Sequence, residues 1–337
     1  MSLARHIRQV VRGAGNSNDL SEEEAHDLFA AMLDGGASEL EIGAALSAVR
    51  MKGESLSELL GFGRAVGERV HALKAPPSPP MPLVFAAYGG ARDEPNLLPL
   101  LPLMLQRLGV PVLLHGTMEG GGRVAAAYIL RELGILPCGT LAQAQRALEE
   151  EGLAFVPTAV LCPGLAMLLA LRSRLGFRSC AHTLAKLLDP FAKHCVRVAS
   201  ATRPDQLAAL EALFSTTATE ALLLRSTEGE PFANPRQRPR MLHFRDGAAQ
   251  ILFDEEPVPS RGAVSLPSAV DAAATAQWIR LALNGQVPVP HPLVNQFACC
   301  LFASGYTEDM NQAKAIAAVE SGGLASAPGA GNRALVS

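Results

Sequence analysis

The sequence predicts an α/β protein with a small all-helical N-terminal domain and a larger α/β domain built on a central mixed sheet. Three observations lead to this fold class. The first seventy residues carry repeated helix-start signals, a proline-rich segment follows at 74–82, and short apolar runs then alternate with helical stretches. The chain of 337 residues is 49% hydrophobic, which is enough for a sizeable core and too apolar for a disordered protein.

The N-terminal helices are predicted from three capping boxes, in which a serine precedes a glutamate by three residues: Ser21 to Glu24, Ser38 to Glu41, and Ser55 to Glu58. The serine oxygen accepts from a free backbone N–H, and the glutamate reaches back to the N–H of the serine. After the first box, the apolar residues of 25–33 repeat at helical spacing, and Gly35-Gly36 supplies a stop.

Beyond residue 82, short apolar runs that end at turn residues predict strands, and longer amphipathic stretches predict helices. Strands are expected at 83–88, 110–114, 156–161, 196–199, 221–224 and 241–244. Helices are expected at 97–108, 123–133, 165–175, 181–188, 205–214, 269–283, 294–302 and 308–319.

The domain boundaries follow from these patterns. We assign residues 1–73 to the helical small domain, with helices near 164–190 joining it. Residues 74–82 hold five prolines and form a hinge, because proline-rich linkers are stiff and extended. Residues 83–320 form the large domain, and 321–337 are expected to be a disordered tail.

Composition excludes several classes of protein. The longest unbroken apolar run, Leu97 to Leu105, is far shorter than the roughly 20 residues of a membrane span. The N-terminus lacks the apolar stretch of a secretory signal. The six cysteines form no CxxC and no zinc-site spacing, so buried, reduced thiols are expected. We therefore expect a cytoplasmic protein with no membrane partner, no metal site and no cofactor.

Charge is unevenly distributed along the chain. The net charge is −3, yet residues 172–245 carry twelve Lys and Arg against six Asp and Glu. This segment could form one basic face that binds anions, or its charges could scatter in space.

A second indication of anion binding comes from the turns that follow the first two strands. Glycines there let backbone N–H groups approach an anion, and an asparagine could cap the next helix, whose N-terminus favours phosphate. The alternatives are an ordinary turn and a structural histidine. The candidate phosphate-binding residues are Tyr88, Gly89, Gly90, Asn96 and His115.

This layout resembles anthranilate phosphoribosyltransferase and the nucleoside phosphorylases related to it, over nearly the whole chain to about residue 320. The motifs differ. The family's diphosphate loop Gly-Thr-Gly-Gly-Asp is Ala87-Tyr-Gly-Gly-Ala91 here, and Leu98 stands where the family has a serine that helps hold magnesium. Leu114 and Met118 replace cationic positions, and no adjacent acidic pair stands near Glu228. Arg172 does match the arginine that such enzymes use on the anthranilate carboxylate.

These differences make normal transferase activity improbable. Displacing diphosphate from phosphoribosyl diphosphate needs Mg²⁺ and cationic groups that stabilise the leaving group. Each missing donor typically costs about 10²–10³ in rate.

The pattern of differences is similar to a particular branch of the family, the YbiB-type relatives. The phrases that carry this resemblance are Tyr88-Gly-Gly-Ala-Arg92 with Asn96-Leu97, Arg178-Ser-Cys-Ala-His-Thr-Leu-Ala-Lys186, Thr227-Glu-Gly-Glu230, Ala233-Asn-Pro-Arg236, Thr275-Ala-Gln-Trp278 and Ala298-Cys-Cys-Leu301. The resemblance implies a homodimer that keeps the transferase fold and binds DNA and RNA through backbone phosphates with little sequence preference. Asp93 and Glu94 add acidic charge where a basic groove would be expected.

We therefore expect a sequence-nonspecific nucleic-acid-binding protein with no catalytic residues. The alternatives are a phosphoribosyl- or glycosyltransferase with an altered substrate, and a scaffold that acts through protein contacts. The expected nucleic-acid-binding residues are Arg172, Arg174, Arg178 and Lys186, with Arg92 and Arg123 as secondary contacts. Arg174 and Arg178 would share one face if a helix continues through Gly176, and Arg172 would point inward if it does not.

Overall fold

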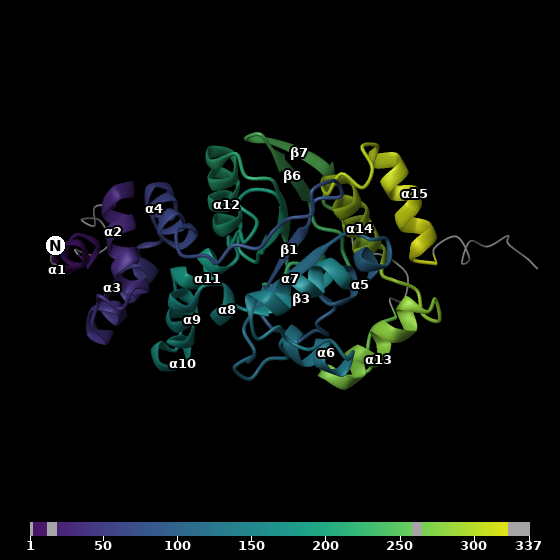
Figure 1. Ribbon diagram of the computed structural model, residues 1–337, viewed down its shortest axis with the longest axis horizontal. Helices are drawn as coiled ribbons and strands as arrows, with labels where there is room; N and C mark the ends of the chain where they lie inside the picture. Colours follow the sequence, from purple (N-terminus) through teal and green to yellow (C-terminus); the bar gives the residue numbers. More distant parts are fainter. Residues whose placement is uncertain (1–2, 12–18, 258–264, 323–337) are drawn as a thin grey trace, which may run out of the picture.

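The computed structural model describes residues 3–11, 19–257 and 265–322. The predicted fold class is confirmed: a helical N-terminal bundle stands beside a larger α/β domain (Figure 1). The bundle begins with α1 (Leu3–Val11), α2 (Glu22–Leu33), α3 (Glu39–Lys52) and α4 (Leu56–Gly67). The expected disordered tail falls, from residue 323 onward, outside the described residues.

All three predicted capping boxes are present. Ser21, Ser38 and Ser55 each accept from the backbone N–H three residues on, and the glutamate at that position accepts from the serine N–H. The apolar stripe of 25–33 is buried against α4, where Phe29 and Phe62 lie with ring centroids 4.9 Å apart. Local capping therefore sets where these helices begin, and the apolar stripe sets which face is buried.

A seven-stranded mixed sheet forms the centre of the described part of the large domain, in the order β3-β2-β1-β4-β5-β6-β7. The strands are β1 (Leu83–Ala87), β2 (Val112–Gly116), β3 (Leu153–Pro157), β4 (Val196–Ala201), β5 (Ala221–Arg225), β6 (Met241–Arg245) and β7 (Ala248–Phe253). The first five strands in the chain are parallel, and β6 and β7 are antiparallel. The strands that follow β1 in the chain, β2 and β3, lie on one side of it in the sheet, and β4 and β5 lie on the other side. A topological switch point therefore lies between β1 and β4.

Helices cover both faces of the sheet. One face packs on α5 (Leu100–Arg107), α6 (Ala126–Glu132), α13 (Ala272–Leu283), α14 (His291–Ala303) and α15 (Met310–Glu320). The other face packs on α7 (Leu141–Glu150) and α8 (Thr158–Leu161) at the β2–β3 end, and on α12 (Pro204–Thr217) at the β4–β5 end. Alternate residues along each strand enter the two cores, as the pleat requires.

Three more helices lie between the bundle and the sheet: α9 (Pro163–Ala170), α10 (Arg172–Leu175) and α11 (Cys180–Ala185). Residues of α9 and α11 share one hydrophobic core with α2, α3 and α4. That core also takes in Ala86 and Tyr88, at the end of β1. The bundle is thus joined to the carboxyl edge of the sheet by packed side chains.

Several predicted elements differ from the structure. The strand expected at 156–161 is wrong over its last four residues: β3 runs from Leu153 to Pro157, and residues 158–161 form α8. The helix expected at 165–175 is two helices, and it begins at Pro163, because proline suits the first turn. The helix α7 and the edge strand β7 were not predicted; β7 lies at the edge of the sheet and exposes its first four residues.

Within the described residues, no helix is long and apolar enough to span a membrane. All six cysteines are buried and free, as the spacing predicted.

Candidate anion-binding site

Two loops meet where the parallel strands end. The β1 loop (residues 88–94) follows β1, and the β5 loop (residues 226–232) follows β5, with β4 between these two strands. In open α/β sheets, ligands bind outside the carboxyl ends of the strands at the switch point. The helices α10 and α11 face the same edge. We call this region, formed by the two loops together with Arg172, Arg178 and Lys186, the mouth.

Glu228 of the β5 loop reaches into the β1 loop. Its carboxylate accepts from the backbone N–H groups of Arg92 at 3.0 Å, Asp93 at 3.0 Å and Glu94 at 2.9 Å. The guanidinium of Arg123 pairs with the same carboxylate. Side chains of Glu228 and Arg123 are only 11% and 17% exposed, so the pair is largely shielded from water. The N–H groups of the β1 loop therefore already hold an anion.

Glu230 takes another N–H group of this loop. Its Oε1 accepts from the Gly90 N–H at 2.5 Å, while its Oε2 has no partner within the described residues. Burial raises the pKa of Glu230 to about 7, although the Gly90 N–H and the charges of Lys186 and Arg178 act in the opposite direction. Near neutral pH this carboxyl is therefore partly protonated.

Glycine at 89 and 90 allows the two loops to approach. A Cβ on Gly89 would lie 3.1 Å from the Glu228 carbonyl oxygen, and Gly90 has a φ of +60°. A side chain at 89 would push the β5 loop away, and an L-residue at 90 would be strained. These glycines were expected to let an anion approach the backbone, and the group that lies against Gly89 is the protein's own β5 loop.

Cationic side chains converge on the mouth from α10, α11 and their connection. Arg178 donates to the Gly89 carbonyl at 2.8 Å, and Lys186 donates to the Ser200 carbonyl at 2.6 Å. Burial lowers the pKa of Arg178, and the charges of Arg172 and Arg123 lower it further. Burial and the charge of Arg178 likewise lower the pKa of Lys186 to about 8. Arg178 is therefore close enough to Arg172, Arg123 and Lys186 to be repelled by each of them.

Tyr88 and His115 do not face the mouth. His115 is fully buried, and the Tyr88 hydroxyl lies 2.8 Å from its Nδ1. Thr158 Oγ1 is 2.8 Å from the same hydroxyl and 3.0 Å from the Gly116 carbonyl. Burial lowers the pKa of His115 to about 3, so the ring is neutral. The expectation that His115 opens onto the mouth is wrong, because β1, β2 and α8 enclose it.

Asn96 is also buried and bonded within the fold. Its side chain donates to the Val124 carbonyl at 3.1 Å and accepts from the Leu98 N–H at 3.2 Å. The helix α5 begins at Leu100 with Pro99 as its N-cap, so Asn96 does not cap it. The expectation that Asn96 caps a phosphate-binding helix is therefore wrong.

Arg174 and Arg178 do not share a helical face. The helix α10 ends at Leu175, and Gly176 adopts a left-handed φ of +77°. Arg174 instead makes two 2.9 Å hydrogen bonds to Glu39 on the outer surface. Arg174 therefore points to Glu39, whereas Arg178 points to the Gly89 carbonyl. Arg172 is near enough to Arg178 for its charge to lower the pKa of Arg178.

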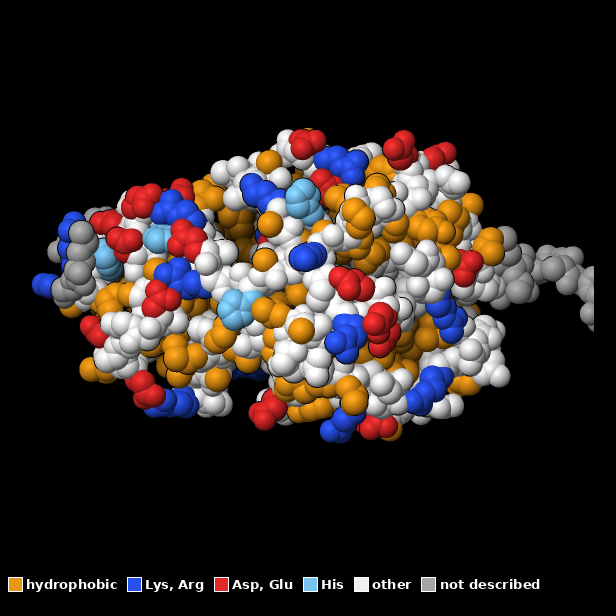
Figure 2. Space-filling model, viewed as in Figure 1, with side chains coloured by type: hydrophobic (Ala, Val, Ile, Leu, Met, Phe, Trp, Pro, Cys, Tyr) orange, Lys and Arg blue, Asp and Glu red, His pale blue; other side chains and the backbone are white. Residues whose placement is uncertain are grey.

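Most of the basic segment 172–245 is dispersed over the molecule. Arg92 is 67% exposed beside Asp93 at the rim of the mouth. Four arginines away from the mouth pair with acidic side chains: Arg203 with Asp205, Arg238 with Glu256, Arg240 with Asp254, and Arg245 with Glu220. A fifth, Arg236, pairs with Glu94 at the end of the β1 loop. Figure 2 shows acidic and basic side chains interspersed on one face. The segment does not form one continuous basic face.

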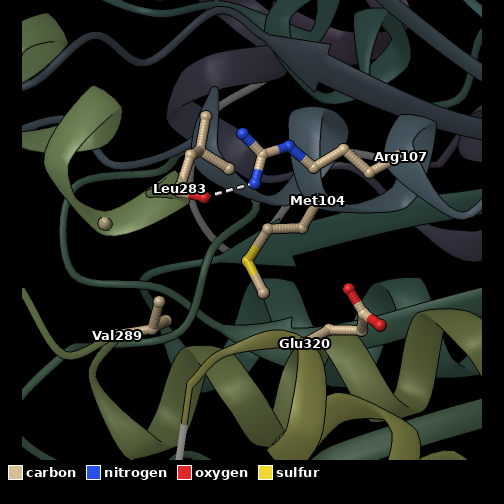
Figure 3. Close-up of a pocket in the computed structure, with 6 residues that line it drawn as sticks. Met104, Arg107, Leu283, Val289 and Glu320 are labelled. Atoms are coloured by element: carbon tan, nitrogen blue, oxygen red, sulfur yellow. Dashed lines mark hydrogen bonds between the residues drawn. The ribbon is translucent and has the colours of Figure 1, made fainter. Parts of the chain in front are cut away.

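Two cavities lie elsewhere in the large domain. The smaller, of about 10 Å³, lies where Met104 and Arg107 of α5 meet Leu283, and Arg107 donates to the Leu283 carbonyl (Figure 3). Its volume is about that of a single water molecule, and it lies where the end of α13 packs on α5. The larger, of about 520 Å³, lies between α14, α15 and Phe253. Neither cavity adjoins the mouth.

Comparisons with known proteins agree with this fold. Residues 4–69 match the family described as glycosyl transferase family, helical bundle domain. Anthranilate phosphoribosyltransferase from Thermus thermophilus has a similar structure, with a TM-score of 0.71 over 94% of each chain at 20% identity. The enzyme of the same name from Methanopyrus kandleri is 26% identical over 87% of this chain and 86% of its own. The N-terminal domain thus matches the helical bundle domain of the glycosyl transferase family, and the chain has the anthranilate phosphoribosyltransferase fold.

A nearer relative is a protein of Escherichia coli K12 described as uncharacterized protein YbiB. It is 39% identical over 306 residues, which cover 90% of this chain and 95% of the relative. The chain belongs to the same family as YbiB.

A yeast anthranilate phosphoribosyltransferase was solved in complex with PRPP and Mg, and its structure matches this chain with a TM-score of 0.69. The side chains at the mouth of this chain do not suit that metal. Magnesium takes carboxylate oxygens as ligands, but Glu228 is saturated by N–H groups and Arg123, and Glu230 lies beside Lys186 and Arg178. Among the residues that the structure describes, no group of three or more His, Cys, Asp or Glu is arranged to hold a metal.

Glu228, Glu230 and Thr158 were not predicted as site residues. The segment Thr227-Glu-Gly-Glu230 supports the family resemblance, but nothing in a single sequence indicates that it contacts a loop about 140 residues away. Two glutamates flanking a glycine, in a loop after a buried strand, are the only local signal.

Proposed function

We propose that this protein binds nucleic acid with little sequence preference, through backbone phosphates at the mouth. The supporting observation is the placement of Arg178 between Arg172 and Lys186: burial lowers the pKa values of Arg178 and Lys186, and the charges of Arg172 on Arg178 and of Arg178 on Lys186 lower them further. A phosphate near these groups would relieve that repulsion. Glu230, with a pKa of about 7, offsets them only in part.

The proposal rests on general electrostatics. Lys and Arg that neutralise phosphates release counterions, which gives sequence-independent affinity. Aromatic residues make up 5% of the chain, so base stacking would contribute little beside backbone contacts. Arg92 at the rim is a secondary contact. Arg123 is engaged with Glu228, so its contribution depends on that ion pair.

We also propose that the protein is a cytoplasmic homodimer. Large apolar side chains are exposed on the outer helices of the bundle: Val11 of α1 is 55% exposed, and Leu40 and Met51 of α3 are 83% and 87% exposed. Such residues favour an interface between copies. Light scattering at micromolar concentration tests this proposal, and a monomer there would contradict it.

The test of nucleic-acid binding is fluorescence anisotropy of a labelled oligonucleotide over a range of salt concentrations. Arg178→Gln should weaken binding similarly for unrelated sequences and reduce the slope of log K against log salt by about one unit. Arg174→Gln is the matched control, because it removes the same charge four residues away, where Glu39 already pairs with it. If both variants behave like the wild type, the mouth is not the binding site.

The alternative is a transferase with an altered substrate. It is tested by diphosphate release from phosphoribosyl diphosphate with anthranilate and Mg²⁺. We expect no detectable turnover, because Glu228 occupies the N–H groups of the β1 loop and Leu98 offers no metal ligand. Turnover within about 10²-fold of ordinary enzymes, which run at roughly 1–10³ s⁻¹, would favour the transferase over the nucleic-acid-binding protein.

A further inference from the structure

The larger of the two cavities, of about 520 Å³ between α14, α15 and Phe253, has the size of a ligand-binding site. Pockets that hold small molecules typically measure roughly 300–1,000 Å³. Asn295 and Ala298 of α14 are buried where they line this cavity, whereas His291 and Lys314 are exposed at its rim. The cavity is therefore open to solvent on one side and lined by buried side chains on the other.

Most of the lining is aliphatic. The aliphatic side chains are those of Pro288, Val289, Val294, Ala298 and Ala318. The phenyl ring of Phe253 is already engaged by two cations: its centroid lies 5.1 Å from the Arg238 guanidinium and 4.9 Å from the Lys314 ammonium. An apolar ligand would thus contact mainly aliphatic groups.

The polar groups of the cavity lie on one side of it. Asn295 and Cys299 are four residues apart on α14 and share a helical face. Burial raises the pKa of the Cys299 thiol, and the charges of Lys314 and Arg238 act in the opposite direction. Both cations are therefore close to the helical face that carries the Asn295 amide.

Two of these polar groups lack a partner. Asn295 is only 6% exposed, and its Nδ2 has no hydrogen-bond partner within the described residues. An unpaired buried amide donor costs free energy that a ligand acceptor would recover. Arg238 pairs with Glu256 at 3.2 Å, but Lys314 makes no ion pair in the part of the chain that the structure describes. The cavity therefore offers a buried donor and an unneutralised cation to an anionic ligand.

We propose that this cavity binds a small aliphatic carboxylate, whose carboxylate group contacts Lys314 and Asn295 and whose hydrocarbon chain lies along the aliphatic wall. A carboxylate accepts strong, charge-assisted hydrogen bonds from an ammonium group. A purely polar anion would leave the aliphatic wall without contacts, and an uncharged hydrocarbon would leave the Asn295 amide unpaired. The cavity does not adjoin the mouth, so the inference does not depend on nucleic-acid binding there.

The test is isothermal titration of the full-length protein with octanoate, and with octanol as a probe that has the same chain but no charge. Wild type should bind octanoate at least about tenfold more tightly than octanol, because only octanoate uses the cation. Lys314→Gln should weaken octanoate binding about tenfold and leave octanol binding unchanged. Lys193→Gln is the matched control, since it removes the same charge from an exposed side chain that does not line the cavity.

Three results of this titration would overturn the proposal. Wild type that binds no octanoate lacks the site. Equal affinity of wild type for octanoate and octanol would mean that the cavity takes an uncharged apolar occupant. Equal weakening in Lys314→Gln and Lys193→Gln would reduce the effect to net charge.

A second pair of variants locates the site without changing its charges. Ala318 lines the cavity, whereas Ala315, three residues earlier on α15, is exposed and does not line it. Ala318→Phe fills the cavity and should abolish binding of octanoate and octanol, and Ala315→Phe should bind both like wild type. Octanoate binding that persists in folded Ala318→Phe would refute the assignment. If thermal melts show that Ala318→Phe does not fold, the Lys314 variant decides, because its side chain is exposed and its loss leaves the core intact.

Discussion

Two glycines on α4 allow a matched test of how the bundle packs. A Cβ on Gly61 would lie 2.2 Å from the Glu22 carbonyl oxygen and 2.8 Å from the Ala25 Cβ, both in α2. A Cβ on Gly63, two residues further along the same helix, would meet no atom within 4 Å. To relieve the first contact, α2 and α4 would have to separate by roughly 1 Å, which a close-packed interface resists.

The two alanine variants should therefore have effects of opposite sign. Gly63→Ala should raise the free energy of unfolding by about 0.5–1 kcal/mol, because alanine loses less entropy than glycine in a helix. Gly61→Ala has the same helix-propensity gain but overpacks the interface, so it should lower the free energy of unfolding by about 1–3 kcal/mol. Urea denaturation followed by circular dichroism measures both. If Gly61→Ala were as stable as Gly63→Ala, the close approach of α2 and α4 would be wrong.

Two further predictions concern pH and capping. Glu230 has a raised pKa of about 7, so between about pH 4.5 and 7 the folded state holds a proton that the unfolded state has released. Wild type should thus lose stability relative to Glu230→Gln as pH rises through that window; a difference independent of pH in thermal melts would contradict this. Ser38→Ala removes the cap that accepts from the Glu41 N–H, and should cost about 1 kcal/mol in denaturant titrations. An unchanged midpoint would show that this cap contributes nothing.

Local chemistry determined the parts of this fold that the sequence predicted well. A capping box needs only a serine and a glutamate three residues apart, and all three formed as predicted. Apolar runs that end at turn residues predicted β1, β2, β4, β5 and β6, because strands that are buried on both faces need little beyond such a run. The same reasoning missed β7, which is an exposed edge strand, and extended β3 into α8, since apolar residues of 158–161 suit either state.

Tertiary structure alone decided what the mouth contains. The glycines of the β1 loop indicated space for an anion, but only the fold brings Glu228 from a distant loop to fill it. Likewise, the position of His115 at the end of a strand predicted that its ring would be open to a ligand, but α8 and Tyr88 enclose the ring in the folded protein. Helix-start signals act within four residues and can be read from the chain. Contacts across more than a hundred residues depend on sheet order and loop approach, which no local pattern encodes.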